Sequence, residues 1–426
     1  MTINKIHSLF LECSSVSTDT RNIEKDCFFI ALKGDNFDAN TFAKEGLEKG
    51  AKYVIIDNQN FYIDHRTILV ENSLETLQEL AKFHRKHIGL PIIALTGSNG
   101  KTTTKELINV VLSRRYNTVA TIGNLNNHIG VPLTLLRFTK DTEIGIVEMG
   151  ANHPKEIEQL CSIAQPDYGY ITNFGKAHLE GFGGVEGVIK GKSEMYDYLQ
   201  TNNKLAFINI DDPIQKEKSE KLNNYTFSTT QEADVNINKV AANPMVSIEY
   251  NGLEIQSNLI GIYNANNINA AIAIGTYFEV SDEDIKDAIE NYIPENNRSQ
   301  LIHKKGNEII LDAYNANPSS MQAAITNFIQ LDNNNKIAVL GDMFELGTES
   351  LEEHKRIVEL VANEAEIRTF FVGKYFYANK IASESISFFE DYNSFSSYFK
   401  EQNLSNNLIL IKGSRGMALE KTLEII

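Results

Sequence analysis

The residues best able to do chemistry lie in a glycine-rich segment, TGSNGKTTT, at positions 96 to 104. A short apolar stretch, Ile92 to Thr96, precedes it and predicts a buried strand, and residues 102 to 115 predict a helix. A loop between a strand and a helix can present backbone N–H groups to the phosphates of a nucleotide. Lys101 is at the position that reaches the β- and γ-phosphates, and Thr102 at the position whose hydroxyl binds Mg²⁺. The remaining predicted phosphate contacts are Gly97, Ser98, Asn99, Gly100 and Thr103.

This loop departs from the general phosphate-binding pattern G-x-x-x-x-G-K-[ST]. Leu95 stands where the first glycine of that pattern would fall, so the segment is a tighter variant, T-G-x-x-G-K-T-T. The alternative is a chance glycine-rich turn. We disfavour it because Lys101 and Thr102 have the correct register between strand and helix.

Two further polar residues follow predicted strands. Glu148 ends the strand predicted at 144–149, where an acid that holds a metal is expected, although Asp is commoner there. His178 follows the strand predicted at 168–172 and so lies at the carboxyl edge of the sheet, where ligands bind. A second Mg²⁺ would explain His178. The alternatives are a strand-end carboxylate without a metal and a structural histidine.

Lys192 lies in the segment VIKGKSEMY, on a predicted helix. A lysine on a helix face is normally solvated, and its position alone gives no reason to assign it a function.

The elements that must position these residues group into three regions. Residues 1–88 mix helices with short strands, among them strands at 53–57 and 67–70 and a helix at 73–87, and a Gly-Leu-Pro break follows. Residues 89–295 alternate strands with helices, which predicts a parallel sheet covered on both faces. Within them, 233–260 predicts antiparallel strands with a hairpin turn at Asn251-Gly252. Residues 296–426 predict another α/β unit, with strands at 308–312, 336–341, 369–372 and 408–412.

Composition excludes several classes of protein. The chain has 426 residues, which favours about three domains, and its 56 acidic and 40 basic residues give a net charge of −16. Such an acidic chain is unsuited to general binding of nucleic acid or anionic membrane. Its apolar runs are too short to span a bilayer or to form a secretory signal. The three cysteines, Cys13, Cys27 and Cys161, are too scattered for a disulfide framework or a zinc site. We therefore expect a monomeric cytoplasmic protein.

Several strings together resemble the Mur ligase superfamily. They are TGSNGKTTTKE from 96, GNLNNHIGVP at 123–132, EMGANH at 148–153, AHLEGFG at 177–183, DAYNANPSSM at 312–321, GDMFELG at 341–347, KGSRG at 412–416, and STDTR at 17–21 followed by FFIALKG at 28–34. They span nearly the whole chain in the family's order. The NLNN and YNANP strings resemble the branch that adds D-alanyl-D-alanine.

The resemblance implies a fold and an activity. The fold has three domains: a small mixed α/β domain at 1–88 that binds the uridine nucleotide, a central P-loop ATPase domain with a parallel sheet at 89–295, and a Rossmann-like domain at 296–426 that closes on ATP and binds the dipeptide. The activity is ATP-dependent amide-bond formation between UDP-N-acetylmuramoyl-tripeptide and D-alanyl-D-alanine through an acyl phosphate, in peptidoglycan precursor synthesis.

The resemblance also implies roles for individual residues. Glu148 and His178 hold a second Mg²⁺, and Lys192 aligns with a lysine that is carbamylated in the family and then supports that metal. Adenine is held at Asn264 and Asn267, and Arg298 and Asp312 close on the ATP phosphates and ribose. The remaining implied contacts are Thr20, Arg21, Asn36 and Asp38 for the uridine nucleotide, and Asn126 and Asn127 for the muropeptide. Tyr263 stands where the family usually has histidine, and a tyrosine there could stack on adenine.

Three alternatives stay open at this point. One is a sister ligase that adds a different amino acid, or an enzyme like folylpolyglutamate synthase, which the asparagine-rich string at 123–127 disfavours. Another is a P-loop ATPase without ligase activity. The last is a binding module without catalysis. It is disfavoured because all five candidate catalytic residues are present: Lys101, Thr102, Glu148, His178 and Lys192.

Overall fold

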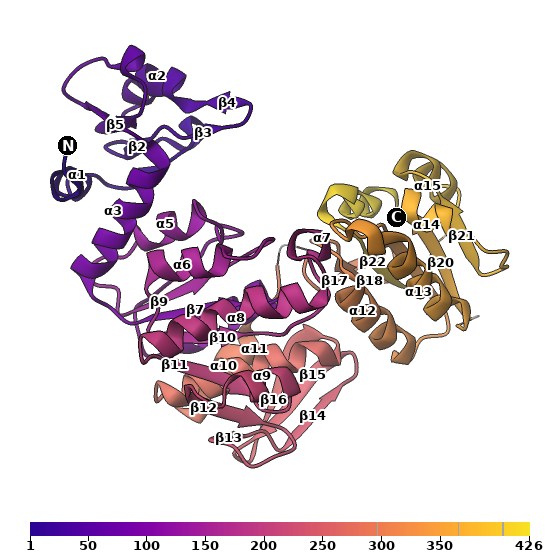
Figure 1. Cartoon of the computed structure of the whole chain (residues 1–426). Coiled ribbons are helices and arrows are strands. Elements are labelled where there is room, and N and C mark those ends of the chain that lie inside the picture. The colour runs from indigo at the N-terminus through magenta and orange to yellow at the C-terminus, as the bar shows by residue number, and fades with distance from the viewer. Residues whose placement is uncertain (296, 365, 403) are drawn as a thin grey trace.

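The computed structural model shows three α/β bodies along the chain (Figure 1). It describes residues 1–295, 297–364, 366–402 and 404–426. The expected second domain boundary, at 294–297, therefore includes Asn296, which lies outside the described residues.

The N-terminal body contains a small parallel sheet of order β1-β2-β5-β6 and a separate hairpin, β3–β4. Its strands are β1 (Val16–Ser17), β2 (Phe28–Ile30), β3 (Lys33–Gly34), β4 (Phe37–Asp38), β5 (Tyr53–Ile56) and β6 (Thr67–Leu69), and its helices are α1 (Ile3–Phe10), α2 (Ala43–Glu48) and α3 (Ser73–Ile88). Helix α3 begins at the side-chain cap of Asn72 and ends at Gly89, whose φ of 74° terminates it. The expected strands and helix of this region are present within one residue of their predicted ends.

The central body is built on a seven-stranded parallel sheet of order β13-β12-β11-β10-β7-β9-β8. Its strands are β7 (Ile92–Thr96), β8 (Thr118–Ala120), β9 (Ile144–Glu148), β10 (Tyr168–Ile171), β11 (Leu205–Asn209), β12 (Asn223–Ser228) and β13 (Val235–Asn236). Strand β7 lies between β9 and β10, so the loops after these three strands share one edge of the sheet. The order in which strands are added to the sheet reverses beside β7, which makes that edge the usual place for a ligand.

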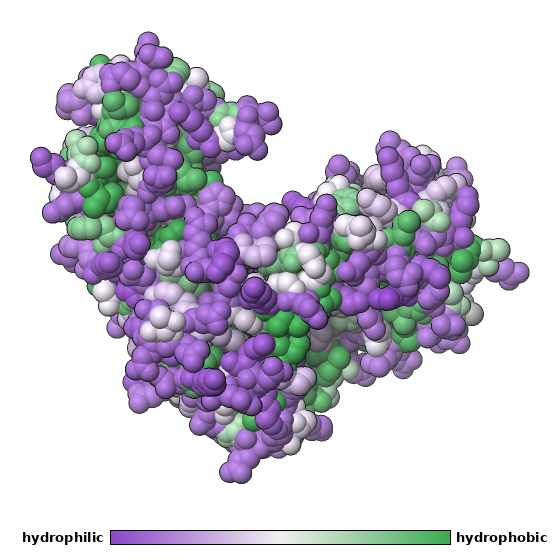
Figure 2. Space-filling view, viewed as in Figure 1, coloured by the Kyte–Doolittle hydropathy of each residue, from purple (hydrophilic) through white to green (hydrophobic). Residues whose placement is uncertain are grey.

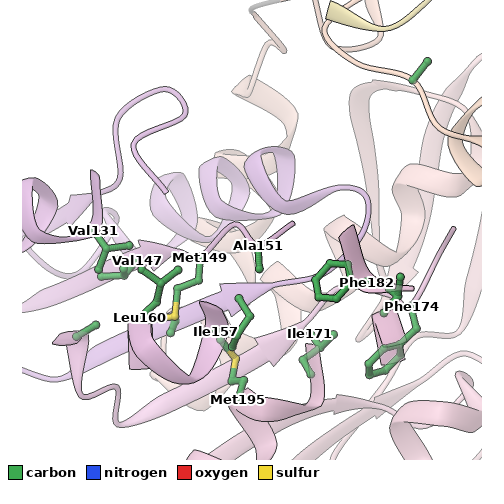
Figure 3. Close-up of a cluster of buried hydrophobic side chains, with 14 of the residues drawn as sticks. Val131, Val147, Met149, Ala151, Ile157, Leu160, Ile171, Phe174, Phe182 and Met195 are labelled. Carbon is green, nitrogen blue, oxygen red and sulfur yellow. The ribbon is translucent and has the colours of Figure 1, made fainter. Parts of the chain in front are cut away.

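Helices cover both faces of the central sheet, as the alternation predicted. They are α4 (Lys101–Leu112), α5 (Gly130–Leu135), α6 (Glu156–Ala164), α7 (Leu179–Phe182), α8 (Val185–Thr201), α9 (Pro213–Lys218), α10 (Ala265–Tyr277) and α11 (Asp282–Asn291). On one face α6 and α8 pack through buried side chains such as Ile157, Leu160 and Met195 (Figure 3). Helices α4, α10 and α11 pack on the other face. Helix α4 ends at Leu112, three residues before the predicted end at Arg115.

Within the segment 233–260, antiparallel strands are present as β14 (Lys239–Ala242), β15 (Met245–Tyr250) and β16 (Leu253–Ile260). The prediction was wrong for 235–236, because β13 pairs in parallel with β12 at the edge of the central sheet. Asn251 and Gly252 join β15 to β16, with φ of 49° and 78°. Positive φ at both positions is what a two-residue hairpin turn requires, so the predicted turn is confirmed.

The C-terminal body has a six-stranded sheet of order β17-β18-β22-β19-β20-β21, parallel except for the pairing of β17 with β18. Its strands are β17 (Gln300–Lys304), β18 (Asn307–Asp312), β19 (Lys336–Gly341), β20 (Ile367–Val372), β21 (Ile386–Phe389) and β22 (Leu408–Lys412), and its helices are α12 (Pro318–Gln330), α13 (Ser350–Ala362), α14 (Lys374–Ala378) and α15 (Tyr392–Phe399). The four predicted strands are present, and β17 and β21 add to them.

Helix α3 joins the N-terminal body to the central one. Arg85 forms an ion pair with Asp167 at 2.7 Å, and His84 Nε2 lies 2.8 Å from the carbonyl oxygen of Phe138. The space-filling view shows a wide notch between the N-terminal and C-terminal bodies, with the central body at its base (Figure 2). Among the described helices, none has the length and apolar character needed to cross a membrane.

Candidate active site

A cavity of about 770 Å³ lies at the carboxyl edge of the central sheet, between the central and C-terminal bodies. Fourteen of the predicted site residues line it: Ser98, Asn99, Gly100, Lys101, Thr102, Thr103, Asn126, Asn127, Glu148, His178, Asn264, Asn267, Arg298 and Asp312. Residues far apart in the sequence are thus brought to one place.

The phosphate-binding loop has the backbone that its glycines predict. Gly97 and Gly100 have φ of 143° and 78°, and a Cβ at Gly100 would lie 2.4 Å from Asn267 Oδ1. Helix α4 begins at Lys101 without a side-chain cap, which leaves the N–H groups of its first turn free for an anion. The Lys101 ammonium donates to the carbonyl oxygen of Gly97 at 2.8 Å. The ammonium therefore lies over the phosphate-binding loop.

The pKa of Lys101 is lowered, first by burial. The charge of Glu148 opposes this shift, and that of Arg298 adds to it. A phosphate placed among these groups would relieve the repulsion between the two cations.

Asn264 and Asn267 connect helix α10 to the phosphate-binding loop. Asn267 Oδ1 accepts from Thr104 Oγ1 at 3.0 Å, and its amide donates to Asn264 Oδ1 at 2.9 Å. Asn264 in turn donates to the carbonyl oxygen of Ile260. Both amides therefore fix the joint between α4 and α10, and both line the cavity. Tyr263 lies beside them and bonds through its hydroxyl to Ser299 of the C-terminal body at 3.0 Å.

Glu148 is buried, with 1% of its surface exposed. One carboxylate oxygen accepts from Asn126 Nδ2 at 2.7 Å, and the other has no hydrogen-bond partner. A buried carboxylate oxygen without a partner is costly unless a cation or a proton occupies it. Asn127 has a different task, because its side chain accepts from the backbone N–H of Gly130 at 2.9 Å and so orders the start of α5.

His178 lies at the junction with the C-terminal body. It has a φ of 54°, and its Nδ1 is hydrogen-bonded to the carboxylate of Glu345. Hydrogen bonding to His178 lowers the pKa of Glu345. Within the part of the chain that the structure describes, no three His, Cys, Asp or Glu side chains form a ready metal cluster. A metal held at Glu148 and His178 would therefore need oxygen ligands of other kinds.

Lys192 is not on a solvated helix face. It is 1% exposed, its ammonium donates to the carbonyl oxygen of Ala151 at 3.0 Å, and it lies 5.1 Å from the centre of the Phe182 ring. Burial lowers its pKa well below the usual value, and the charge of Lys101 lowers it further. The solvated position that is normal for a lysine on a helix face is therefore wrong for Lys192, because α8 turns this face toward the sheet.

Arg298 and Asp312 come from the C-terminal body. The Arg298 guanidinium stacks 3.7 Å from the centre of the Tyr314 ring, and its buried Nε has no partner. Asp312 accepts from Lys412 Nζ at 2.6 Å. The two residues reach the same cavity as Lys101, so the site draws on both bodies.

The four residues expected to hold a uridine nucleotide lie elsewhere, in the N-terminal body. Arg21 pairs with Asp19 at 2.6 Å, and Asp38 accepts from the backbone N–H of Asn40 at 2.9 Å. Thr20 is half-buried and Asn36 is exposed. None of the four lines the cavity.

Sequence reasoning named no role for several residues that line or join the cavity. Asn317 caps α12 and donates to Asn99 Oδ1 at 2.7 Å, and the backbone N–H of Lys176 donates to Ser319 Oγ at 2.8 Å. Asn173 accepts from the backbone N–H of Asn99. The string DAYNANPSSM contains Asn317 and Ser319, but their contacts run over more than 140 positions of sequence and leave no local pattern.

Comparison with known proteins identifies the fold and the family. The family model for the Mur ligase middle domain matches residues 95–275, and that for the Mur ligase, glutamate ligase domain, matches 297–415. A UDP-N-acetylmuramoyl-tripeptide–D-alanyl-D-alanine ligase of Bacillus subtilis is 37% identical, over 95% of this chain and 91% of its own. The ligase of the same name from Escherichia coli is 33% identical, over 97% and 93%.

This chain belongs to the MurF branch of the Mur ligase family. A crystal structure of MurF from Acinetobacter baumannii superimposes with a TM-score of 0.87 at 30% identity, over 99% of this chain and 97% of its own. MurF from Thermotoga maritima, solved in complex with ADP, superimposes with a TM-score of 0.84 at 28% identity, over 98% and 97%. The three-domain α/β architecture of MurF is therefore confirmed for this chain.

Proposed function

We propose that this chain, a MurF-type ATP-dependent ligase, joins D-alanyl-D-alanine to UDP-N-acetylmuramoyl-tripeptide in the cytoplasm. The observation that carries the proposal is identity of 37% to a ligase of that name over nearly the whole chain. The cavity adds support from this chain itself, because it combines a phosphate-binding loop with cations and amides from a second body. We assign residues 1–88 to the uridine nucleotide, 89–295 to ATP and chemistry, and 296–426 to closure and the dipeptide.

The phosphates of ATP are assigned to the loop from Gly97 to Thr103. Its free N–H groups and the Lys101 ammonium neutralise the β- and γ-phosphates, and Arg298 approaches from the opposite side. Adenine is assigned to Asn264 and Asn267, and the ribose to Asp312. The ADP complex of the Thermotoga maritima relative supports this use of the fold.

The residues present fit two Mg²⁺ ions. The hydroxyl of Thr102 lines the cavity at the start of α4, and the unpartnered oxygen of Glu148 is a buried hard ligand. Thr102 would hold the first ion, and Glu148 and His178 would supply ligands to the second. When bound, the metal supplies charge neutralisation for the transferring phosphoryl group.

Lys192 fits the carbamylated lysine of the family. An uncharged amine is needed for its lone pair to attack the carbon of CO₂, with loss of one proton and formation of a carbamate. Burial among Phe182 and the carbonyl of Ala151 lowers its pKa and so favours that uncharged amine. The carbamate would place an anion near Lys101, where the protonated ammonium of Lys192 would instead add to the repulsion.

The reaction then follows from positioning. The free carboxylate of the tripeptide attacks the γ-phosphorus, the bond to ADP breaks, and an acyl phosphate forms. The amine of the dipeptide attacks the acyl carbon, the amide forms, and phosphate leaves with one oxygen of the original carboxylate. The amine loses a proton, which the departing phosphate can accept. The loop, Lys101 and Arg298 hold the phosphoryl group in line.

The test is phosphate release from ATP in the presence of UDP-N-acetylmuramoyl-tripeptide. We expect release to require D-alanyl-D-alanine and to fall to background with D-alanine, L-alanine or D-glutamate alone. A single amino acid that supports release would indicate a sister ligase. Release that ignores the amine altogether would indicate an ATPase and contradict the proposal.

A further inference from the structure

A carboxylate from the C-terminal body contacts His178, which lines the cavity. Glu345 lies in the loop between β19 and α13, and its carboxylate is hydrogen-bonded to Nδ1 of His178. The same loop is tied to α7 through the backbone, because the N–H of Glu180 donates to the carbonyl oxygen of Glu345 at 3.2 Å. Two contacts, one of side chains and one of backbones, therefore join Glu345 to the segment that begins with His178.

The chemistry of the pair determines where the proton of the neutral imidazole lies. An ionised carboxylate only accepts hydrogen bonds, so Nδ1 of His178 must carry the hydrogen. In a neutral imidazole the lone pair is then on Nε2. A histidine held in this way by a carboxylate is oriented and made more basic at its other nitrogen, which is the nitrogen left for a cation.

We propose that Glu345 is a positioning residue that fixes the tautomer and orientation of His178, and that it does so only while the C-terminal body is docked. The proposal rests on the proposed role of His178 in holding Mg²⁺. It makes the metal side of the site depend on domain docking, because the orienting carboxylate belongs to one body and the histidine to the other.

The loop that carries Glu345 is rigidly built, as an orienting group requires. Asp342 is 3% exposed and accepts from the backbone N–H groups of Tyr375 and Phe376, both at 3.0 Å. Met343 donates its backbone N–H to the buried ring of His354 at 3.0 Å. Glu345 itself has a φ of 62°, a left-handed conformation that is unfavourable in a residue other than glycine. Such a conformation is kept where surrounding contacts fix it, and here those contacts are with α7.

A second ion pair at the same interface supplies the control. Lys176 pairs with Glu353 at 2.6 Å, which also joins the central and C-terminal bodies, but it does not touch His178. Glu353 keeps Arg356 as a partner at 2.7 Å when Lys176 is removed. Lys176→Ala therefore removes one contact between the two bodies without altering the imidazole.

The experiment measures Mn²⁺ binding to the full chain in the presence of ADP, by electron paramagnetic resonance. We expect Glu345→Ala to raise the half-saturating Mn²⁺ concentration roughly tenfold or more. Lys176→Ala should change it by no more than about twofold, because Lys176 does not touch His178 and the buried Glu353 keeps Arg356 as a partner. Glu345→Gln, whose amide oxygen still accepts from Nδ1–H, should recover part of the loss. When His178 is already replaced by alanine, Glu345→Ala should not raise the half-saturating Mn²⁺ concentration further, because Glu345 acts only through His178.

A second measurement separates this proposal from the proposed function. The ¹⁵N spectrum of the neutral His178 ring should show the hydrogen on Nδ1 in the wild type and a mixture of tautomers in Glu345→Ala. A hydrogen on Nε2 in the wild type, equal effects of Glu345→Ala and Lys176→Ala, or additivity with His178→Ala would each overturn the role of Glu345. If His178→Ala alone leaves Mn²⁺ binding unchanged, the metal role of His178 is wrong, and the ¹⁵N spectrum still decides whether Glu345 sets the tautomer.

Discussion

Burial lowers the pKa of both Lys101 and Lys192, and the charge of Lys101 lowers the pKa of Lys192 further. A bound phosphate, the expected ligand of Lys101, would offset the cost of keeping its ammonium charged. In the structure the ammonium donates to the carbonyl oxygen of Gly97. Lys192 is buried against Phe182, and its ammonium donates to the carbonyl oxygen of Ala151. The two lysines therefore call for different tests.

Replacing Lys101 by alanine should remove the charge that we assign to neutralising the β- and γ-phosphates. We expect ligation to fall at least about 10²-fold, the usual effect of removing one electrostatic contact to a transition state. The circular dichroism spectrum should be unchanged, because Lys101 Nζ contacts only backbone carbonyls of its own loop. Normal turnover in this variant would contradict the assignment of the phosphate site.

Replacing Lys192 by alanine should remove the group that we expect to carry a carbamate. We expect activity to fall by roughly 10–100-fold, as for loss of a group that supports a metal ligand set. Because the deletion leaves space in a buried position, added acetate or propionate should restore part of the activity. Kinetics with and without these acids provide the measurement, and full activity without them would return Lys192 to a structural role.

At this scale, the positions of residues that depend on their neighbours in sequence could be predicted. Lys101 and Thr102 were identified by their register in the loop, and Glu148 by its place at a strand end. The burial of Lys192 could not, since it depends on how α8 rotates against the sheet. Nor could the partnership of His178 with Glu345, which joins positions 167 residues apart.

Helix α10 packs against the phosphate-binding loop and limits the conformations that the loop can adopt. Asn267 lies so close to Gly100 that a Cβ there would be 2.4 Å from its Oδ1. The amide also holds Thr104 of α4. The loop, the start of α4 and the start of α10 therefore form one unit, and a side chain at Gly100 should disturb all of it.

Gly100→Ala tests that unit, with Gly252→Ala as its control. Both glycines have a φ of 78°, but nothing lies within 4 Å of a Cβ at Gly252. Each variant should lose roughly 1–3 kcal/mol of unfolding free energy from backbone strain. Only Gly100→Ala should lose more than that and also weaken ADP binding, measured by calorimetry. Equal stability losses and unchanged ADP affinity would show that Asn267 does not restrict the loop.

Helices and strands with a clear hydrophobic or turn pattern in the sequence were predicted. A strand that forms only because neighbouring strands pair with it was not. Strand β7 was predicted at its observed ends, Ile92 and Thr96, and the hairpin turn at Asn251-Gly252 is confirmed. Strand β12, NNYTFS, has three polar residues among its first four and escaped notice. It becomes a strand because β11 and β13 pair with it on either side, which is a property of the sheet.

On the scale of the molecule, the notch between the N-terminal and C-terminal bodies separates the expected uridine site from the ATP cavity (Figure 2). The tripeptide substrate must connect the two. The net charge of −16 makes it necessary that anionic substrates find local cations, and Lys101 and Arg298 are cations in the cavity. The three domains could be predicted from the order of motifs, but their relative placement could not.

Binding of both substrates should narrow the notch. We expect the radius of gyration from small-angle X-ray scattering to fall when UDP-N-acetylmuramoyl-tripeptide and a non-hydrolysable ATP analogue are added together, and to fall less with either alone. Closure by two ligands is expected when each body supplies part of one site. An unchanged radius with both ligands would mean that the observed arrangement is already the working one.

The central claim is that ATP drives amide formation through an acyl phosphate. It is tested most directly with tripeptide substrate labelled with ¹⁸O in its free carboxylate, followed by mass spectrometry of both products. The account predicts one ¹⁸O in each phosphate released and a nucleotide product that has gained D-alanyl-D-alanine. Phosphate free of ¹⁸O, or ATP consumed without gain of the dipeptide, would contradict it.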